Sequence, residues 1–330
     1  MIHSNSEGDI YIEEMPLLLV HLREEEKGAD ARLSEVLSYA LDGYAYETAT
    51  EISAFEDYVN RWRCLEKTQN RKNLVQGRIL FAVPLGTSGI NLELYRLIRF
   101  LREHPDFLNG FVGGLLVDSE NDLYSKSAAK DLVFAANCAG CAFVGRPLVE
   151  GTRTLSNYTI VSNNLGTDLM GAYRESAAGL VKEVLGTDCV RKKCPKVLVL
   201  HASSHKTSNT YAIWNRVKEQ LPEMEIREIG LRNGTLSDCA GCPYKMCLHF
   251  GEQGSCFYGG VMVEDVYPAV READAIVMLC PNYNDALSAN LTAFINRLTS
   301  LFRTTRFYDK ALFAVVVSGY SGSDIVAEQL

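Results

Sequence analysis

The sequence lacks any apolar run long enough to cross a membrane, and it lacks runs of lysine and arginine. Its apolar stretches at 17–20, 79–85 and 312–317 fall far short of the roughly 18 residues that a membrane-spanning helix needs. The net charge of −8, from 33 basic and 41 acidic residues, argues against binding to the phosphate backbone of nucleic acids. We therefore expect neither a membrane nor a nucleic acid as a partner.

We also expect no secretion signal at the start of the sequence. Residues 1–14 are polar and acidic, without the basic start and the apolar core of a signal peptide. We expect a cytoplasmic protein, in which the ten cysteines are free thiols, metal ligands or redox groups and not structural disulfides.

Apolar strand patterns alternate with helical patterns in two series along the chain. The first series predicts strands at 16–22, 46–51, 77–84, 110–118 and 141–149 and helices at 31–41, 52–67, 90–104, 127–140 and 168–186. The second series predicts strands at 196–202, 225–231, 274–281 and 310–318 and helices at 210–221, 263–273, 289–302 and from 323 onward. This alternation predicts an α/β fold with parallel sheets covered by helices on both faces. A short basic linker at 186–196 divides the series, so we predict domains at 1–190 and 191–330.

A polar turn, HASSHKTSNT at 201–210, follows the first strand of the second series and opens a helix. A helix N-terminus offers unpaired backbone N–H groups and a positive dipole end, which together attract a phosphate. The side chains suited to complete a phosphate cage are Ser203, His205, Lys206, Ser208, Asn209 and Thr210. The alternative interpretation is a helix cap with solvated neighbours, because Ser, Thr and Asn also favour N-cap positions.

The loop after the second strand of this series holds four of the ten cysteines, Cys239, Cys242, Cys247 and Cys256. Four thiolates from one compact loop suit a [4Fe–4S] cluster or Zn²⁺. Structural zinc more often uses two separated Cys-x2-Cys pairs, and only one such pair is present here. Unligated thiols are the third interpretation.

A further loop, CPNYNDALSANLTAFINR at 280–297, ends the third strand and enters a helix. With the polar turn and the cysteine loop, it resembles the flavodoxin-like NAD(P)H-dependent FMN reductase family, including its iron–sulfur flavoprotein branch. The family's phosphate turn reads Gly-Ser-x-Arg-x-x-Ser-Asn-Thr, and the positions that match it are Ser203, Ser208, Asn209 and Thr210. Ala202 replaces the glycine, His205 the arginine, and Asn296 a later aspartate of the family pattern. The likeness covers 196–330.

The resemblance implies a site for the flavin ring. The family's Pro-x-Tyr loop wraps the flavin, which implies contacts from Pro281, Asn282, Tyr283, Asn284, Asp285 and Ala286. The turn after the fourth strand is expected on the far side of the ring, with Ser318, Gly319, Tyr320 and Gly322. In a sheet of order 2-1-3-4-5, ligands bind where the order reverses, at the carboxyl ends of the first and third strands. Tyr283 is alternatively a half-buried loop aromatic.

The implied architecture is two flavodoxin-like doubly wound parallel-sheet domains, the second lacking its fifth strand. The first domain shares the fold by pattern only, and three glutamates at 24–26 follow its first strand and would repel a phosphate. We therefore expect no FMN in the first domain. In the second, the missing strand exposes the edge of the fourth, and exposed edges invite pairing with another chain. The exposed edge predicts a homodimer. The resemblance implies the same, because members of the family usually dimerise around their flavins.

The resemblance implies a flavin-dependent oxidoreductase that binds FMN non-covalently and moves electrons from NAD(P)H to a cluster or an external acceptor. No catalytic acid or base is expected, because the flavin performs the hydride chemistry. Two alternatives are a non-enzymatic FMN/iron–sulfur electron carrier that exchanges electrons with ferredoxin, and a metal-stabilised interaction protein without flavin.

Overall fold

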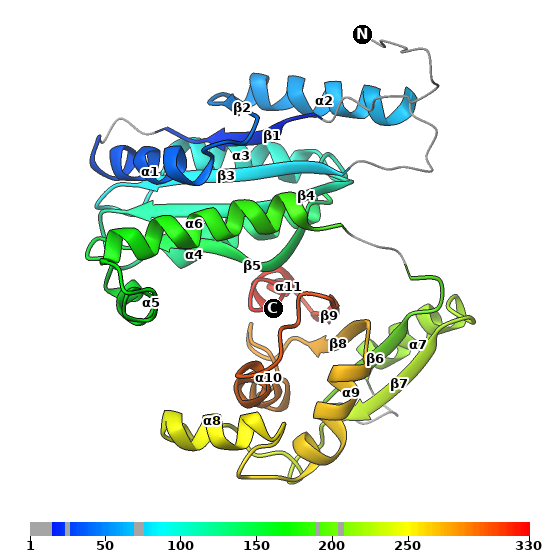
Figure 1. Ribbon diagram of the computed structural model, residues 1–330. Helices are drawn as coiled ribbons and strands as arrows, with labels where there is room; N and C mark the ends of the chain where they lie inside the picture. Colours follow the sequence, from blue (N-terminus) through cyan, green and yellow to red (C-terminus); the bar gives the residue numbers. More distant parts are fainter. Residues whose placement is uncertain (1–14, 24–26, 69–75, 189–191, 204–207) are drawn as a thin grey trace, which may run out of the picture. The chain divides into compact units, whose positions relative to one another are not determined.

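The computed structural model describes residues 15–23, 27–68, 76–188, 192–203 and 208–330. The chain divides into two compact units, Met1–Cys189 and Val190–Leu330 (Figure 1). Each unit contains a parallel sheet with alternating helices, so the predicted α/β, flavodoxin-like fold class is confirmed. No helix in the described part of the chain is long and apolar enough to cross a membrane.

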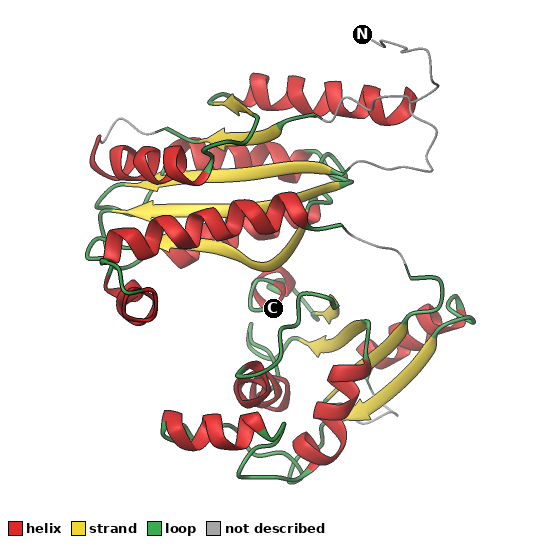
Figure 2. Cartoon of the chain, in the orientation of Figure 1, coloured by secondary structure: helices red, strands yellow, loops and turns green. Residues whose placement is uncertain are grey.

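The first unit holds a five-stranded parallel sheet (Figure 2). In spatial order its strands are β2 (Tyr46–Ala49), β1 (Leu17–His21), β3 (Gly77–Leu85), β4 (Phe111–Ser119) and β5 (Ala142–Gly151). The strand order reverses between β1 and β3, which makes the carboxyl ends of these strands the expected position for a ligand.

Helices cover both faces of this sheet because its strands are apolar on both sides. Along β1, Leu18 and Val20 belong to one core, whereas Leu17 and Leu19 belong to the other. The helices are α1 (Lys27–Ala40), α2 (Ile52–Thr68), α3 (Leu92–Glu103), α4 (Ser125–Cys138), α5 (Thr159–Leu165) and α6 (Leu169–Gly186). Residues of α2, α3 and α4 fill the first core, and residues of α1 and α6 fill the second.

The second unit holds a four-stranded parallel sheet, as predicted. In spatial order its strands are β7 (Glu225–Gly230), β6 (Lys196–His201), β8 (Ala275–Pro281) and β9 (Ala311–Val317). The order reverses between β6 and β8. β9 forms the outer edge, where Leu312 and Phe313 are 51% and 58% exposed.

The helices of the second unit are α7 (Asn209–Glu219), α8 (Tyr244–Glu252), α9 (Tyr267–Glu272), α10 (Ala289–Phe302) and α11 (Ser323–Ala327). The core on one face of the sheet takes residues from α9 and α10, and Trp214 of α7 packs into the core on the other face. A π-helical turn, Met262–Val266, leads into α9. The sequence pattern did not predict α5, nor α8, which lies inside the segment expected to be an irregular cysteine loop.

Glu228 connects the edge strand β7 to α7. Its carboxylate accepts hydrogen bonds from Tyr211 Oη at 2.6 Å, Trp214 Nε1 at 3.4 Å and Lys218 Nζ at 2.7 Å. Burial acts to raise the pKa of Glu228, but these hydrogen bonds outweigh burial and hold the pKa below its ordinary value. The charged carboxylate therefore satisfies the indole N–H of Trp214, whose side chain is 2% exposed in the core.

We predict that Glu228→Gln lowers the free energy of unfolding of the second unit by about 1–2 kcal/mol at neutral pH, because it weakens hydrogen bonds to a charged group. The folded-state pKa lies below the ordinary value of 4.5, so the contribution is complete above that value and is lost as the pH falls through the folded-state pKa. Urea unfolding followed by Trp214 fluorescence, in a Trp62→Phe background, measures the effect. Glu219→Gln, at an exposed position of α7, is the matched control, and an equal loss in both variants would contradict the prediction.

Candidate functional site

A cavity of about 380 Å³ opens at the carboxyl edge of the second sheet. Its walls come from the turn after β6, the loop after β7 and the loop that joins β8 to α10. The lining residues are Ala202, Ser203, Asn233, Tyr283, Leu287, Ser288, Ala289 and Asn290. We call this the edge cavity. Ala202 and Ser203 therefore meet the Tyr283 loop, distant in sequence, at the position where the strand order reverses.

The Tyr283 loop is a tight hairpin. Tyr283 and Ala286 form an antiparallel bridge, and each backbone N–H donates to the other's carbonyl, at 3.4 and 3.3 Å. The two residues between them, Asn284 and Asp285, both have φ of 56°. Asn and Asp tolerate this left-handed conformation better than other residues with a side chain, which explains their presence in the turn. The hairpin leaves the Tyr283 side chain 60% exposed at the cavity wall.

The turn after β9 supports this hairpin. Asn282 Nδ2 donates to Asp285 Oδ1 and to Ser318 Oγ, both at 3.1 Å. Gly322, with φ of 86°, lies so close that a Cβ would stand 2.0 Å from Asp285 Oδ1. Since Asn282 holds that carboxylate in place, glycine is the residue that fits here.

The predicted contacts from the β9 turn are not part of the edge cavity. Among the described residues that line it, none comes from Ser318, Gly319, Tyr320 or Gly322. The Tyr320 side chain is fully exposed. In this structure Ser318 accepts a hydrogen bond from Asn282 and Gly322 lies against Asp285, and their direct contact with a flavin ring stays a prediction.

Three of the predicted phosphate residues have described surroundings. Ser203 lines the edge cavity. Ser208 caps α7, because its Oγ accepts a hydrogen bond from Tyr211 N at 3.3 Å, and it lies 2.7 Å from Thr210 Oγ1. Thr210 is 1% exposed. The helix-cap interpretation therefore describes Ser208, and its role toward a phosphate stays a prediction.

Three further residues of the phosphate prediction have no assigned contact. Asn209 is the first residue of α7. His205 and Lys206 lie outside the described residues.

Three polar side chains of the edge cavity were not predicted. Asn290 Nδ2 donates to Leu231 O at 2.6 Å and to Asn233 Oδ1 at 3.0 Å, which joins the β7 loop to the start of α10. Ser288 stands at the N-cap of α10, yet its buried Oγ has no hydrogen-bond partner in the described part of the chain. A buried hydroxyl without a partner is costly, and a polar group of a ligand in the cavity would satisfy it. The sequence feature that could have indicated Ser288 and Asn290 is the Ser-x-Asn start of α10, directly after the hairpin.

The four predicted metal ligands line a second cavity, of about 230 Å³, which we call the thiol cavity. Cys239 and Cys242 precede α8, Cys247 lies within it, and Cys256 follows it. Across the described residues, no group of three or more His, Cys, Asp or Glu side chains is arranged to hold a metal ion. The donor type and number suit a metal centre, but the sulfur atoms would have to converge to form one.

One face of α10 holds the thiol loop in place. Asn296 Nδ2 donates to Asp238 Oδ1 at 2.9 Å, and Asp238 accepts the backbone N–H of Cys239 at 2.6 Å. Ser300 Oγ donates to Ser255 O, next to Cys256. The same helix starts in the wall of the edge cavity, so α10 reaches both cavities.

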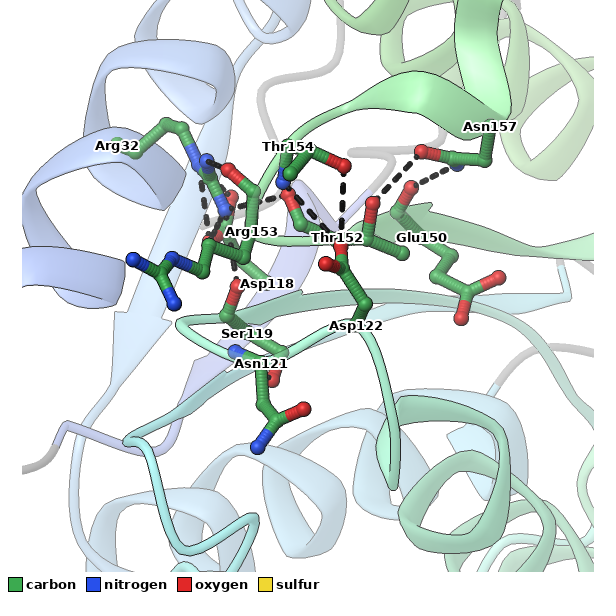
Figure 3. A network of polar contacts seen from close by, with 10 residues as sticks. All are labelled: Arg32, Asp118, Ser119, Asn121, Asp122, Glu150, Thr152, Arg153, Thr154 and Asn157. Carbon is green, nitrogen blue, oxygen red and sulfur yellow. Dashed lines mark hydrogen bonds and ion pairs between the residues drawn. The ribbon is translucent and has the colours of Figure 1, made fainter.

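The matching edge of the first sheet is occupied by a network of charged and polar side chains (Figure 3). Arg32 Nε lies 3.1 and 3.0 Å from the two carboxylate oxygens of Asp118, and Arg32 Nη2 lies 2.7 Å from Oδ1. Arg32 also donates to the backbone carbonyls of Ser119, Thr152 and Arg153. Burial raises the pKa of Asp118, and the contact with Arg32 opposes that rise. The network joins α1 to the ends of β4 and β5.

A carboxylate also lies against the first turn of α1. A Cβ on Gly28 would stand 1.8 Å from Glu120 Oε1, which shows how close the two are. The cavity of about 420 Å³ at this edge is lined by Gly28, Ala29, Arg32, Thr87, Glu120 and Arg153. A negative charge at this helix start disfavours a phosphate there. The absence of FMN from the first unit stays a prediction.

Comparison with protein families matches residues 195–330 to the family described as NADPH-dependent FMN reductase. The match begins at β6 and includes every residue described above for the edge cavity and the thiol cavity. It confirms the family resemblance for the second unit and does not distinguish the iron–sulfur branch. No curated protein matches the chain.

We predict that Arg32→Met destabilises the first unit by about 3 kcal/mol, because it leaves the buried Asp118 carboxylate without its cation. Urea unfolding followed by Trp62 fluorescence, in a Trp214→Phe background, measures this loss. The matched control is Arg99→Met, which breaks an exposed ion pair with Glu103 and should leave the midpoint nearly unchanged. Equal midpoints for the two variants would show that the network contributes little.

We predict that Gly322→Ala destabilises the second unit by about 1–2 kcal/mol, because alanine is strained at a positive φ and its methyl group displaces Asp285. Gly319→Ala is the control on the same turn, since a Cβ there meets nothing within 4 Å. Urea unfolding followed by Trp214 fluorescence compares the two. The account of the turn is wrong if Gly319→Ala is the more destabilising change.

Proposed function

We propose that the second unit binds FMN non-covalently in the edge cavity, and that the chain is a flavin-dependent oxidoreductase that takes electrons from NAD(P)H. One observation carries the proposal. The turn at Ser203 and the hairpin at Tyr283 meet at a single cavity where the strand order reverses, inside the residues that match the FMN reductase family. In open α/β sheets this is the usual position for a nucleotide.

The cavity suits a nucleotide in size and chemistry. Its volume of about 380 Å³ lies within the usual range for small-molecule sites. Two of its wall groups support this proposal. The exposed Tyr283 ring offers a flat surface to the isoalloxazine system. The unpartnered Ser288 hydroxyl offers a hydrogen bond to a polar atom of the ligand.

The residues of the cavity supply binding and orientation. No Asp, Glu, His, Lys or Cys is among the described residues that line it. Hydride transfer needs no protein acid or base, and bound FMN would supply the electron-accepting chemistry. The absence of these side chains from the described wall is therefore compatible with the proposed reaction.

The thiol cavity supports a second candidate, an FMN/iron–sulfur electron carrier. Four cysteine side chains share that cavity, and α10 connects it to the edge cavity. An enzyme and a carrier differ in the reductant that they accept. Anaerobic mixing with NADPH or NADH bleaches the flavin of a reductase rapidly, whereas a carrier stays oxidised with both nucleotides and is reduced by ferredoxin.

We predict that Tyr283→Ala weakens FMN binding by about 2- to 13-fold, since an aromatic stacking contact contributes about 0.5–1.5 kcal/mol. Quenching of FMN fluorescence on titration with the protein measures the dissociation constant. Tyr308→Ala is the matched control, because Tyr308 is also exposed in the second unit and does not line the edge cavity.

Two results would count against the proposal. Full-length protein that binds no added FMN would remove both candidate functions. Equal affinities of the Tyr283→Ala variant and the unmodified protein would place the flavin elsewhere.

A further inference from the structure

The edge cavity offers no full positive charge to the phosphate of a bound FMN. A phosphate monoester carries a charge of about −1.5 to −2 at pH 7. No charged side chain is among the described residues that line the cavity. Backbone N–H groups at a helix start supply only partial positive charges, and hydroxyls are neutral donors. A cation beside the cavity would therefore strengthen the binding of the phosphate.

The described segments that form the cavity walls contain one such cation. These segments are 201–203, 230–236 and 281–290, and Arg232 is the single Lys or Arg within them. The next residue, Asn233, lines the cavity and accepts a hydrogen bond from Asn290. Arg232 is exposed, and within the described part of the chain no carboxylate forms an ion pair with it. Its charge is therefore available to a ligand.

The surroundings of Gly230 show the direction of the Arg232 side chain. Alternate residues of a strand share a face, so Gly230 faces the same side as Glu228, which contacts α7. A Cβ on Gly230 would stand 3.8 Å from Arg232 Nε and 3.3 Å from His201 Cε1. Arg232 Nε and the His201 ring therefore lie within 4 Å of one point, on the face of the sheet that α7 covers.

His201 connects this point to the polar turn and to the start of α7. The His201 side chain is 3% exposed, and its Nδ1 donates to Ser203 O at 3.1 Å. The centroid of its ring lies 5.1 Å from that of Tyr211, whose backbone N–H donates to the Ser208 cap. Arg232, the Ser203 backbone and the first turn of α7 are thus grouped around one buried ring.

We propose that the Arg232 guanidinium binds the phosphate of FMN and makes the edge cavity select FMN over riboflavin. The inference rests on the proposed function and deepens it by naming the group that the site distinguishes. The start of α7 supplies neutral donors, and Arg232 supplies a full charge with a fork of N–H donors that matches a phosphate. Since riboflavin lacks the phosphate, the contribution of Arg232 is confined to FMN.

Titration of the full-length protein with FMN and with riboflavin tests the proposal, with quenching of flavin fluorescence as the readout. We expect Arg232→Gln to weaken FMN binding by about 10-fold or more and to leave riboflavin binding within about twofold. Arg232→Lys keeps the charge without the fork and should lose less FMN affinity than Arg232→Gln. Retained riboflavin binding also shows that each variant is folded.

Arg216→Gln is the matched control. It removes the same charge from an exposed position in the last turn of α7, so we expect it to change neither affinity. Salt gives a second readout, because it screens exposed charges. Added NaCl should weaken FMN binding more in the unmodified protein than in Arg232→Gln. A merely structural role of Arg232 would weaken the binding of both flavins alike and leave this salt dependence unchanged.

Several results would overturn the inference. They are equal losses for FMN and riboflavin in Arg232→Gln, no loss for either flavin, and an equal effect in Arg216→Gln. A smaller preference for NADPH over NADH with unchanged FMN binding would place the arginine at the nicotinamide nucleotide instead. Unmodified protein that binds neither flavin would remove the proposed function itself, whereas equal affinity for both flavins would overturn this inference alone.

Discussion

The second unit depends on the parallel pairing of β6 and β8 at the point where the strand order reverses. Parallel neighbours end at the same edge of a sheet, so the segments that follow them are brought together however far apart they are in sequence. The turn at Ser203 and the hairpin at Tyr283 are neighbours for this reason. Backbone groups beyond the strand ends have no ladder partners, which makes the edge suitable for a polar ligand.

The first sheet has the same strand order around the reversal as the second, but charged side chains occupy its carboxyl edge. There Arg32 directs its donors to Asp118 and to three backbone carbonyls, and the Glu120 carboxylate lies against the start of α1. Charges that satisfy one another stabilise the edge and leave few groups for a ligand. In the second unit the edge keeps an unpartnered hydroxyl at Ser288 and an exposed ring at Tyr283. The carboxyl edge of the first sheet is thus mainly structural, whereas that of the second is the proposed binding edge.

The sequence was sufficient for the sheets because buried parallel strands read as apolar runs, as in 79–85 and 275–280. It was insufficient for α8, because this short helix lies within the cysteine loop and Gly251 is its one fully buried residue. The meeting of Ser203 and Tyr283 at one edge was predictable, because each residue follows a strand that ends at that edge. The contact of Asn290 with Asn233 was not, because it joins segments that only tertiary packing brings together. At Ser208 the sequence does not distinguish a helix cap from a phosphate site, because both use the same residue types.

α10 begins in the wall of one cavity and continues along the wall of the other. A helix rises about 1.5 Å per residue, so the step from Asn290 to Arg297 spans about 10 Å along its axis. Groups bound in the two cavities would therefore contact one helix at positions about two turns apart.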